Sequence, residues 1–260
     1  MIDKEIDFYR FSGTGNTLLA VKAMAEVFRQ HGHNVNLLRI EKCNPRDLII
    51  RRGLTIGLGF TVAAGSTYRF VWEFLKSLPE ADGNKVFMID TMAGFSGGII
   101  GPLQKLLKSK GYTPIGAKEI IMPNNLLPYK DYGDKNSLKI ERGLKRAENY
   151  ARNLLDGKTR WGRIPVFSFL MSLVGKSRFV WRYVARFYGF YIDNSLCNKC
   201  GLCARLCPVG NITMKDYPEY GDKCEVCMRC FSFCPTLAVN SRKKGRHRYA
   251  AVKTGDLIKK

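Results

Sequence analysis

The residues with the clearest chemistry are eight cysteines between residues 197 and 234. They form two runs of the pattern C-x2-C-x2-C-x3-C-P, and every cysteine of the first run recurs 27 residues later in the second. Such a recurrence indicates an internal duplication. Three closely spaced thiolates on a tight loop can point at one metal centre, and this pattern is typical of [4Fe–4S] sites. The runs comprise Cys197, Cys200, Cys203 and Cys207, then Cys224, Cys227, Cys230 and Cys234.

Zinc is the alternative occupant, because it also takes four thiolates, but zinc sites do not usually show this duplicated run followed by proline. A segment of fewer than about fifty residues cannot bury enough apolar surface to fold alone. We therefore expect the metal to serve as its core and the metal-free segment to be unfolded. The apolar side chains expected to cover the metal are Val209, Ile212, Leu237 and Val239.

The segment from about Tyr191 to Asn240 resembles the bacterial ferredoxins that carry two [4Fe–4S] clusters. In that family the cysteine before each proline serves the other cluster. The resemblance implies one cluster on Cys197, Cys200, Cys203 and Cys234, and a second on Cys207, Cys224, Cys227 and Cys230.

A loop rich in hydroxyl groups and glycine follows the first apolar stretch and opens a helix. It comprises Ser12, Gly13, Thr14, Gly15, Asn16 and Thr17. Backbone N–H groups at a helix start, with Ser and Thr hydroxyls, form a phosphate site without a basic side chain. A Walker A loop would need a lysine here, and a dinucleotide loop would need a third glycine where Leu18 stands. A glycine-rich turn without a ligand is the remaining alternative.

This loop resembles the phosphate loop of flavodoxins, and the resemblance extends over about residues 4–155. It implies an FMN whose ring is held by the loops after the third and fourth strands. An aromatic pair to sandwich the ring is not evident, and Tyr68, Phe95 and Tyr129 are the candidates. The implied contacts are the six loop residues Ser12–Thr17, then Thr61, Ala63 and Ala64, then Thr91, Met92, Ala93, Gly94, Phe95, Gly97 and Gly98.

Strands and helices alternate through the first 156 residues. Apolar runs at 6–11, 35–40, 54–60, 86–90 and 119–122 predict five strands, and helical patterns separate them. This alternation favours a parallel sheet covered on both faces. We expect an α/β fold, a flavodoxin-like doubly wound five-stranded parallel sheet, plus a small α+β ferredoxin domain for two [4Fe–4S] clusters. The expected domains are 1–156, a connector at 157–192, the ferredoxin domain at 193–240 and a basic tail at 241–260.

The connector at 157–192 contains no Asp or Glu and is rich in aromatic residues. Arg178, Arg182 and Arg186 would share one stripe of a helix. We predict a pair of helices packed between the domains, with a membrane-surface or partner-docking helix as the alternative. The charge run from Ser241 to Arg248 is expected to be solvated and mobile.

The formal net charge is +21. This charge predicts acidic redox partner proteins or an anionic membrane surface as partners, although a solvated basic surface explains it equally well. We expect no nucleic-acid partner, and the sequence indicates no oligomeric state. Without an apolar run long enough to span a membrane or a signal peptide, we expect a cytoplasmic protein, with peripheral membrane contact as an option.

The remaining reactive side chains predict no catalytic residue. Cys43 has no histidine or second cysteine near it in sequence and is interpreted as a bystander thiol. His31 and His33 are assigned surface roles. No Ser/His/Asp or Cys/His arrangement supports hydrolysis.

Together, the two halves resemble the fused flavodoxin–ferredoxin proteins of anaerobes, which implies an electron-transfer protein rather than a substrate-specific enzyme. The leading interpretation is a relay that passes single electrons between two [4Fe–4S] clusters and an FMN. One alternative is an FMN-dependent reductase of a small acceptor that is fed by the clusters, with Asn124, Asn125 or Tyr129 beside the flavin. A second alternative is a redox module bound to a membrane surface.

Overall fold

The computed structural model describes residues 2–44, 47–126, 133–162, 168–243 and 248–258. Five parallel strands form one sheet in the order β2-β1-β3-β4-β5. This is the flavodoxin-type order of a doubly wound sheet, so the predicted fold is confirmed. The strands are β1 (Glu5–Arg10), β2 (Asn34–Arg39), β3 (Leu54–Thr61), β4 (Lys85–Met92) and β5 (Thr113–Ile121).

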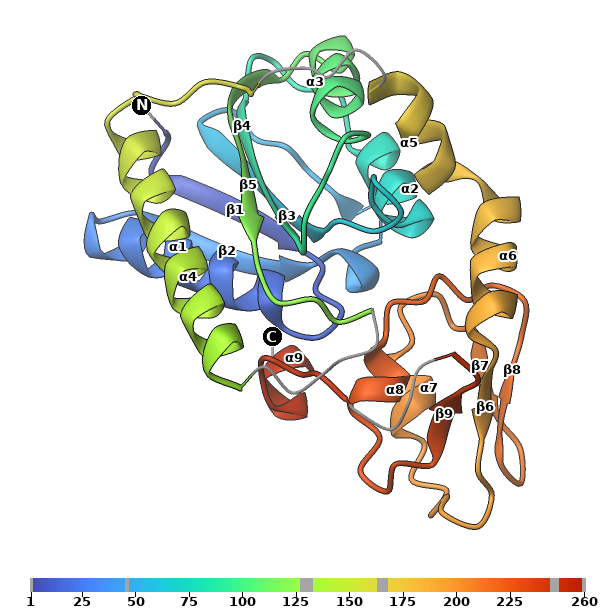
Figure 1. Cartoon of the computed structure of the whole chain (residues 1–260). Helices are drawn as coiled ribbons and strands as arrows, with labels where there is room; N and C mark the ends of the chain where they lie inside the picture. Colours follow the sequence, from blue (N-terminus) through green and yellow to red (C-terminus); the bar gives the residue numbers. More distant parts are fainter. Residues whose placement is uncertain (1, 45–46, 127–132, 163–167, 244–247, 259–260) are drawn as a thin grey trace.

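Four helices cover the two faces of this sheet (Figure 1). One face packs against α1 (Asn16–Gln30) and α4 (Gly133–Leu155), and the other packs against α2 (Arg69–Ser77) and α3 (Ile100–Ser109). The central strand β3 is buried along almost its whole length because both its faces are covered. β5 starts earlier than its apolar run suggested, since this edge strand is only partly buried and alternates irregularly.

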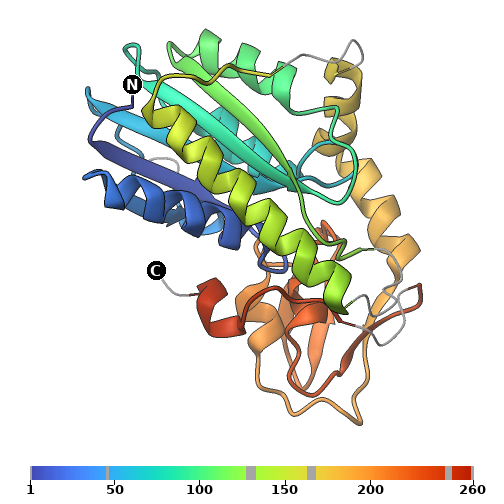
Figure 2. The ribbon, with the colours of Figure 1, turned by 60° about the vertical axis from the view of Figure 1, so that its left-hand side comes forward.

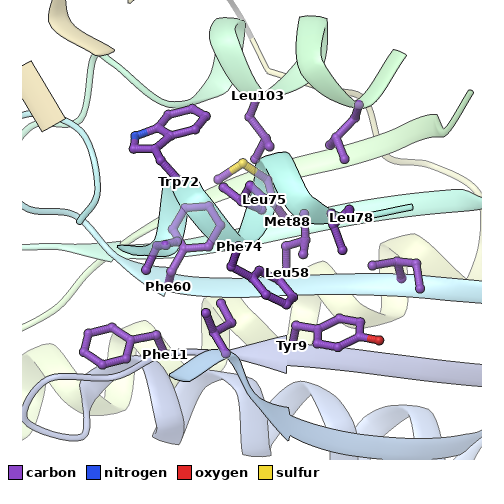
Figure 3. Close-up of a cluster of buried hydrophobic side chains, with 14 of the residues drawn as sticks. Tyr9, Phe11, Leu58, Phe60, Trp72, Phe74, Leu75, Leu78, Met88 and Leu103 are labelled. Carbon is purple, nitrogen blue, oxygen red and sulfur yellow. The ribbon is translucent and has the colours of Figure 1, made fainter. Parts of the chain in front are cut away.

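Large side chains from β3, β4, α2 and α3 form the core on the second face. Figure 3 shows Trp72 and Leu75 of α2 facing Met88 of β4 and Leu103 of α3, and all four side chains are at most 1% exposed. Burying each such side chain stabilises the fold by roughly 2–3 kcal/mol. Phe11 and Phe60, which are also fully buried, fix the ends of β1 and β3, where the loops of the functional site begin.

The cysteine-rich segment forms a small α+β domain. β6 (Phe190–Ile192) pairs antiparallel with β9 (Val239–Ser241), and β7 (Ile212–Met214) pairs antiparallel with β8 (Pro218–Tyr220). The short helices α7 (Leu202–Leu206) and α8 (Arg229–Ser232) lie between these strands in sequence.

The duplication seen in the cysteines recurs in the backbone. Lys199 and Val226, which are 27 residues apart, have φ angles of 59° and 53°. Gly201 and Met228 have 69° and 67°, with the same spacing between them. These left-handed conformations are costly for residues other than glycine, so their repetition shows that both halves impose the same loop geometry.

Two helices lie within the segment that the sequence analysis assigned to a connector. α5 (Ser168–Lys176) and α6 (Arg178–Tyr188) run along one edge of the molecule, from the sheet domain to the small domain (Figures 1 and 2). The hydroxyl of Ser177 caps α6 by accepting a hydrogen bond from the N–H of Val180 at 3.4 Å. In the described parts of the chain, no helix has both the length and the apolar character needed to cross a bilayer.

The expectation of a solvated tail is wrong at Ser241, which is buried at the end of β9, and from Arg248 onward. The guanidinium of Arg248 donates to the carbonyls of Phe231, Leu237 and Val239, and Tyr249 is buried. Leu257 of α9 (Thr254–Ile258) is fully buried in a cluster with Leu18, Leu206 and Phe233. The charge run concealed this packing because an arginine can be buried when carbonyl oxygens accept its N–H groups. Arg242 and Lys243 are exposed as expected, and residues 244–247 lie outside the described residues.

Candidate functional site

A cavity of about 510 Å³ lies at the carboxyl ends of the sheet strands. This is the usual place for a ligand in a doubly wound sheet and a usual size for a cofactor site. Loops after β1, β3, β4 and β5 supply most of its lining, and α6 and the small domain supply the rest. The residues from the sheet domain are Ser12, Thr14, Asn16, Thr61, Val62, Ala63, Ala64, Gly65, Tyr68, Thr91, Met92, Ala93, Gly94, Phe95, Met122, Pro123, Asn124, Asn125 and Leu126.

The hydroxyl-rich loop carries β1 into α1. The N–H of Gly15 donates to the Ser12 hydroxyl at 3.1 Å, and Gly15 itself has a φ of 109°, which favours glycine. The Nδ2 of Asn16 donates to the carbonyl of Pro123 at 2.9 Å. These bonds fix the N-terminal end of α1 at the cavity, where its partial positive charge favours an anion.

Thr17 joins the three loops that the sequence assigned to one site. Its hydroxyl lies 3.0 Å from that of Thr61 at the end of β3 and 2.7 Å from that of Thr91 near the end of β4. Because Thr17 is fully buried, it holds these loops together from beneath rather than lining the cavity.

Eleven of the residues predicted to contact FMN line the cavity, and five others lie next to it. Thr17 is one of these five, and Gly13 and Gly15 pack against other segments of the chain. Gly97 and Gly98 pack against α5, where a Cβ on Gly98 would lie 2.8 Å from the backbone of Met171. Both glycines therefore have a packing reason that their sequence context did not reveal.

The helix α6 forms a wall of the cavity that sequence reasoning did not assign to the site. It contributes Trp181, Tyr183, Val184, Phe187 and Tyr188. The aromatic richness of the connector was a visible signal, but a helical pattern does not say which element its rings will face.

The three aromatic candidates for the ring have different outcomes. Tyr68 is buried and stacks on Phe70 with ring centroids 5.7 Å apart. The ring of Trp181 also contacts Tyr68, with centroids 5.4 Å apart. Phe95 is 66% exposed, although it lines the cavity. Tyr129 lies outside the described residues.

The loop after β5 also reaches the phosphate loop. Asn124 and Asn125 both line the cavity, as the reductase interpretation required. The Nδ2 of Asn125 donates to the Thr14 hydroxyl at 3.0 Å. Asn125 therefore positions the phosphate loop.

The eight cysteines form two groups. One small apolar cavity is lined by Cys197, Cys200, Cys203 and Cys234, and a second by Cys207, Cys224, Cys227 and Cys230. These are the two sets that the resemblance to ferredoxins implied. Within the described residues, no three His, Cys, Asp or Glu side chains converge on a single-ion site. Each set of thiols therefore surrounds a space instead of meeting at a point.

Backbone N–H groups lie close to two of these sulfurs, and others are buried. The N–H of Asn211 lies 3.2 Å from the Cys207 sulfur, and the N–H of Val226 lies 3.4 Å from that of Cys224. Burial raises the pKa of the Cys227 thiol to about 12. A thiolate at such a position requires a compensating cation, which a metal centre supplies.

The loop of the second cysteine set packs directly on the phosphate loop. A Cβ on Gly13 would lie 2.5 Å from the carbonyl oxygen of Cys227, so only glycine fits at this contact. Val226, between two cysteines of that set, lines the large cavity itself. The second set therefore adjoins the cavity.

Arg229 fastens this contact. Its guanidinium is 1% exposed, donates to the carbonyl of Ser12 at 3.0 Å, and lies 4.4 Å from the ring centroid of Phe11. A second hydrogen bond, 3.4 Å long, reaches the carbonyl of Leu206, which precedes a cysteine of the second set. One side chain thus joins the end of β1 to both halves of the small domain.

The C-terminal segment closes the outer side of the phosphate loop. The N–H of Ala251 donates to the carbonyl of Thr14 at 2.7 Å, and Val252 packs against Gly15. The hydroxyl of Tyr249 donates to the side-chain oxygen of Asn16. The loop is therefore held from the sheet, from the small domain and from this segment.

Cys43, His31 and His33 contact the protein backbone. The Cys43 thiol donates to the carbonyl of Arg39 at 3.2 Å, and burial raises its pKa to about 11. The Nδ1 atoms of His31 and His33 each lie 2.8 Å from a carbonyl oxygen, of Val27 and Asp3 respectively.

Comparisons with known proteins agree with this two-part architecture. A family model described as a 4Fe-4S binding domain matches residues 190–213, which is the first of the two repeats. No curated protein matches the chain.

Solved structures resemble the N-terminal part of the chain. A flavodoxin of Streptococcus pneumonia TIGR4 is 12% identical, with 58% of this chain and 97% of that chain covered and a TM-score of 0.43. The two-electron reduced flavodoxin of Megasphaera elsdenii is 21% identical, with 56% and 98% covered and a TM-score of 0.41. A flavo di-iron protein of Thermotoga maritima is 12% identical, with 57% and 36% covered and a TM-score of 0.38.

The fold assignment rests on the strand order rather than on these distant similarities. The chain joins a domain with the flavodoxin strand order to a ferredoxin-type 4Fe–4S binding domain.

Proposed function

We propose that this protein is an iron–sulfur flavoprotein that passes single electrons between two [4Fe–4S] clusters and an FMN. The observation that carries the proposal is the contact between Gly13 of the phosphate loop and the carbonyl of Cys227. That contact would place a cluster held by the second cysteine set beside a flavin held by the cavity. Short separation between redox centres is what a protein contributes to electron transfer, together with control of their electronic surroundings.

The cavity suits an FMN in size and in the distribution of polar groups. Ser12, Thr14 and the start of α1 would hold the phosphate. The loops at Thr61–Ala64 and Thr91–Phe95 would hold the ring, with α6 on the opposite side. When bound, the flavin takes up or releases one or two electrons, whereas each cluster exchanges one.

The two cysteine sets suit multi-atom clusters rather than single metal ions, because each set lines a small cavity. In this proposal Cys207, Cys224, Cys227 and Cys230 hold the cluster beside the flavin. Cys197, Cys200, Cys203 and Cys234 hold the cluster farther from it. The hydrogen bonds from Asn211 and Val226 to cysteine sulfurs would tune the nearer cluster.

The contact at Gly13 and Cys227 would serve a relay and a reductase fed by the clusters alike, and the relay is the leading proposal. The proposed partners are other electron carriers with acidic surfaces, since the chain carries a formal charge of +21. Steady-state assays distinguish the two functions. Rapid exchange with a reduced ferredoxin supports the relay, and turnover of a small acceptor with NADH supports the reductase.

The decisive measurement is the iron, sulfide and flavin content of anaerobically purified protein. We expect about eight irons, eight sulfides and one FMN per chain. Cys227→Ser should lose about half of the iron while Cys43→Ser keeps all of it, because Cys43 belongs to neither set. Zinc in place of iron in the parent protein, or the absence of flavin from the parent and from Cys43→Ser, would contradict the proposal.

Gly13→Ala tests the contact itself. The added methyl group should push the phosphate loop away from Cys227 and slow internal electron transfer after flash reduction of the flavin. Gly255→Ala is the matched control, because nothing lies within 4 Å of its added methyl group. Equal rates of internal electron transfer in the two variants would show that this contact does not set the distance between the flavin and the nearer cluster.

A further inference from the structure

The helix α5 buries its small residues and exposes its large apolar ones, which is the reverse of a normal surface helix. Its small residues Ser168, Ser172 and Gly175 are buried. A Cβ on Gly175 would lie 2.6 Å from the carbonyl oxygen of Thr67, so the helix backbone rests directly on the sheet domain. Its large apolar residues Leu170 and Leu173 are 65% and 59% exposed. An amphipathic helix in water normally buries such residues.

The next helix extends this exposed apolar surface. On α6, Phe179, Tyr183 and Phe187 recur every four residues and are 81%, 73% and 51% exposed, whereas Trp181 is buried. We call the exposed set the apolar ridge: Phe169, Leu170, Leu173, Phe179, Tyr183 and Phe187. The two helices lie along the outer edge of the molecule in both views (Figures 1 and 2). An exposed apolar patch of this kind marks an interaction surface.

The charge on the two helices that carry the apolar ridge is positive, and Asp222 lies beside it. Residues 157–192 contain seven Lys and Arg and no Asp or Glu. Lys105 lies over the ring of Phe169 at 5.6 Å, and Lys243 lies over that of Phe187 at 5.2 Å. Arg178 is paired with Asp222, but Arg182 and Arg186 on the following turns add further positive charge.

We propose that the apolar ridge docks the protein on an anionic lipid bilayer. Exposed Leu and Phe side chains would enter the boundary of the acyl chains, while Arg and Lys meet the lipid phosphates. Tyr183 has an apolar ring and a polar hydroxyl, a combination that suits the interface. A projecting edge whose charge is mainly positive fits a flat anionic surface better than a shaped protein groove.

Docking in this way has a geometric consequence. Tyr183 and Phe187 belong to the apolar ridge and also line the cavity at the end of the sheet. The α6 wall of that cavity would therefore face the bilayer. The docking does not depend on the proposed electron relay, because it needs no cofactor.

The test is co-sedimentation of the full, cofactor-loaded chain with vesicles. Binding is expected to phosphatidylglycerol-containing vesicles and not to pure phosphatidylcholine, and added NaCl should weaken it. Leu170→Ser/Leu173→Ser/Phe179→Ser should bind about tenfold more weakly or worse, because each buried apolar side chain contributes to insertion. None of these three residues lines the cavity, so flavin and iron content should not change.

Matched controls separate the ridge from general charge and hydrophobicity. Ile49→Ser removes an apolar side chain that is 75% exposed elsewhere, and it should bind like the parent. Arg182→Gln/Arg186→Gln should weaken binding more than Arg51→Gln/Arg52→Gln, which removes the same charge from another surface.

Three outcomes would overturn the proposal. They are no binding to anionic vesicles at low salt, equal binding by the triple variant, and equal losses in the two arginine pairs. A dimer of the parent that the triple variant loses, without vesicle binding, would assign the apolar ridge to a second copy of this chain instead.

Discussion

The guanidinium of Arg229 lies 2.8 Å from the carboxylate of Glu41, and the two residues are 188 positions apart in sequence. Both side chains are almost fully buried, at 1% and 2% exposed. Arg229 belongs to the second cysteine loop, and Glu41 lies in the 3-10 helix η1 (Ile40–Lys42) after β2. This ion pair therefore crosses between the small domain and the sheet domain.

Glu41→Gln should destabilise the protein by about 3 kcal/mol, because it leaves the buried Arg229 charge without its carboxylate. Burial raises the pKa of Glu41, but the charges of Arg229 and Arg39 and the hydrogen bonds to the carboxylate together outweigh burial and hold that pKa below its ordinary value. The contribution of the pair is thus present at neutral pH and is lost as the pH falls through that lowered pKa. Anaerobic urea unfolding, followed by cluster absorbance, measures the change.

Glu73→Gln is the control for this variant, since Glu73 pairs with Arg69 at the surface and should cost less than about 1 kcal/mol. Equal effects of the two substitutions would show that the buried pair does not hold the domains together.

Asp90→Asn should stabilise the protein at alkaline pH. Asp90 is fully buried on β4, next to Glu119 on β5, and neither of its oxygens has a hydrogen-bond partner among the described residues. Burial raises its pKa well above the ordinary value, and Glu119 raises it further. The folded state then holds a proton that the unfolded state releases, so stability falls as the pH rises above about 4.

The measurement is the free energy of unfolding from urea titrations at a series of pH values between about 5 and about 9. Asp90→Asn should flatten the decline with pH, and Asp82→Asn, at a side chain 81% exposed, should leave it unchanged. A decline of unchanged slope in Asp90→Asn would contradict the assignment of a neutral carboxyl group.

Leu257→Ala should destabilise the protein by about 3 kcal/mol, because it empties a buried site between the two domains. Its neighbour Ile258 is 42% exposed, so Ile258→Ala should have little effect. Urea unfolding of both variants, with FMN affinity measured alongside, checks the difference. If both variants matched the parent, the C-terminal segment would not hold the phosphate loop.

The Cys43 thiol should react slowly with iodoacetamide at pH 8 in the folded protein. Its pKa is raised to about 11, chiefly by burial, so about one molecule in a thousand carries the reactive thiolate at that pH. Alkylation of the folded protein, followed by peptide mapping, measures the rate. Modification as fast as in denatured protein would contradict the shielded environment of this thiol.

The sequence predicted those features that depend on local pattern. Apolar runs located the five strands, and the resemblance to two-cluster ferredoxins implied the two cysteine sets that the structure brings together.

Features that depend on which surfaces meet were not predictable. Trp181 and Tyr188 form a wall of the cavity because α6 packs there, and nothing in their own spacing specifies that neighbour. The sequence predicted that Gly97 and Gly98 contact the ligand, but the helix α5 packs on them. Arg248 was predicted to be solvated, although three carbonyl groups accept hydrogen bonds from its guanidinium.

The hydrogen bond between Tyr249 and Asn16 joins residues 233 positions apart in the chain. During synthesis, the phosphate loop therefore leaves the ribosome long before the segment that encloses it. A nascent chain can fold its parallel sheet first and leave the outer side of the loop accessible to solvent. This hydrogen bond can form only after the cysteine-rich segment has been synthesised.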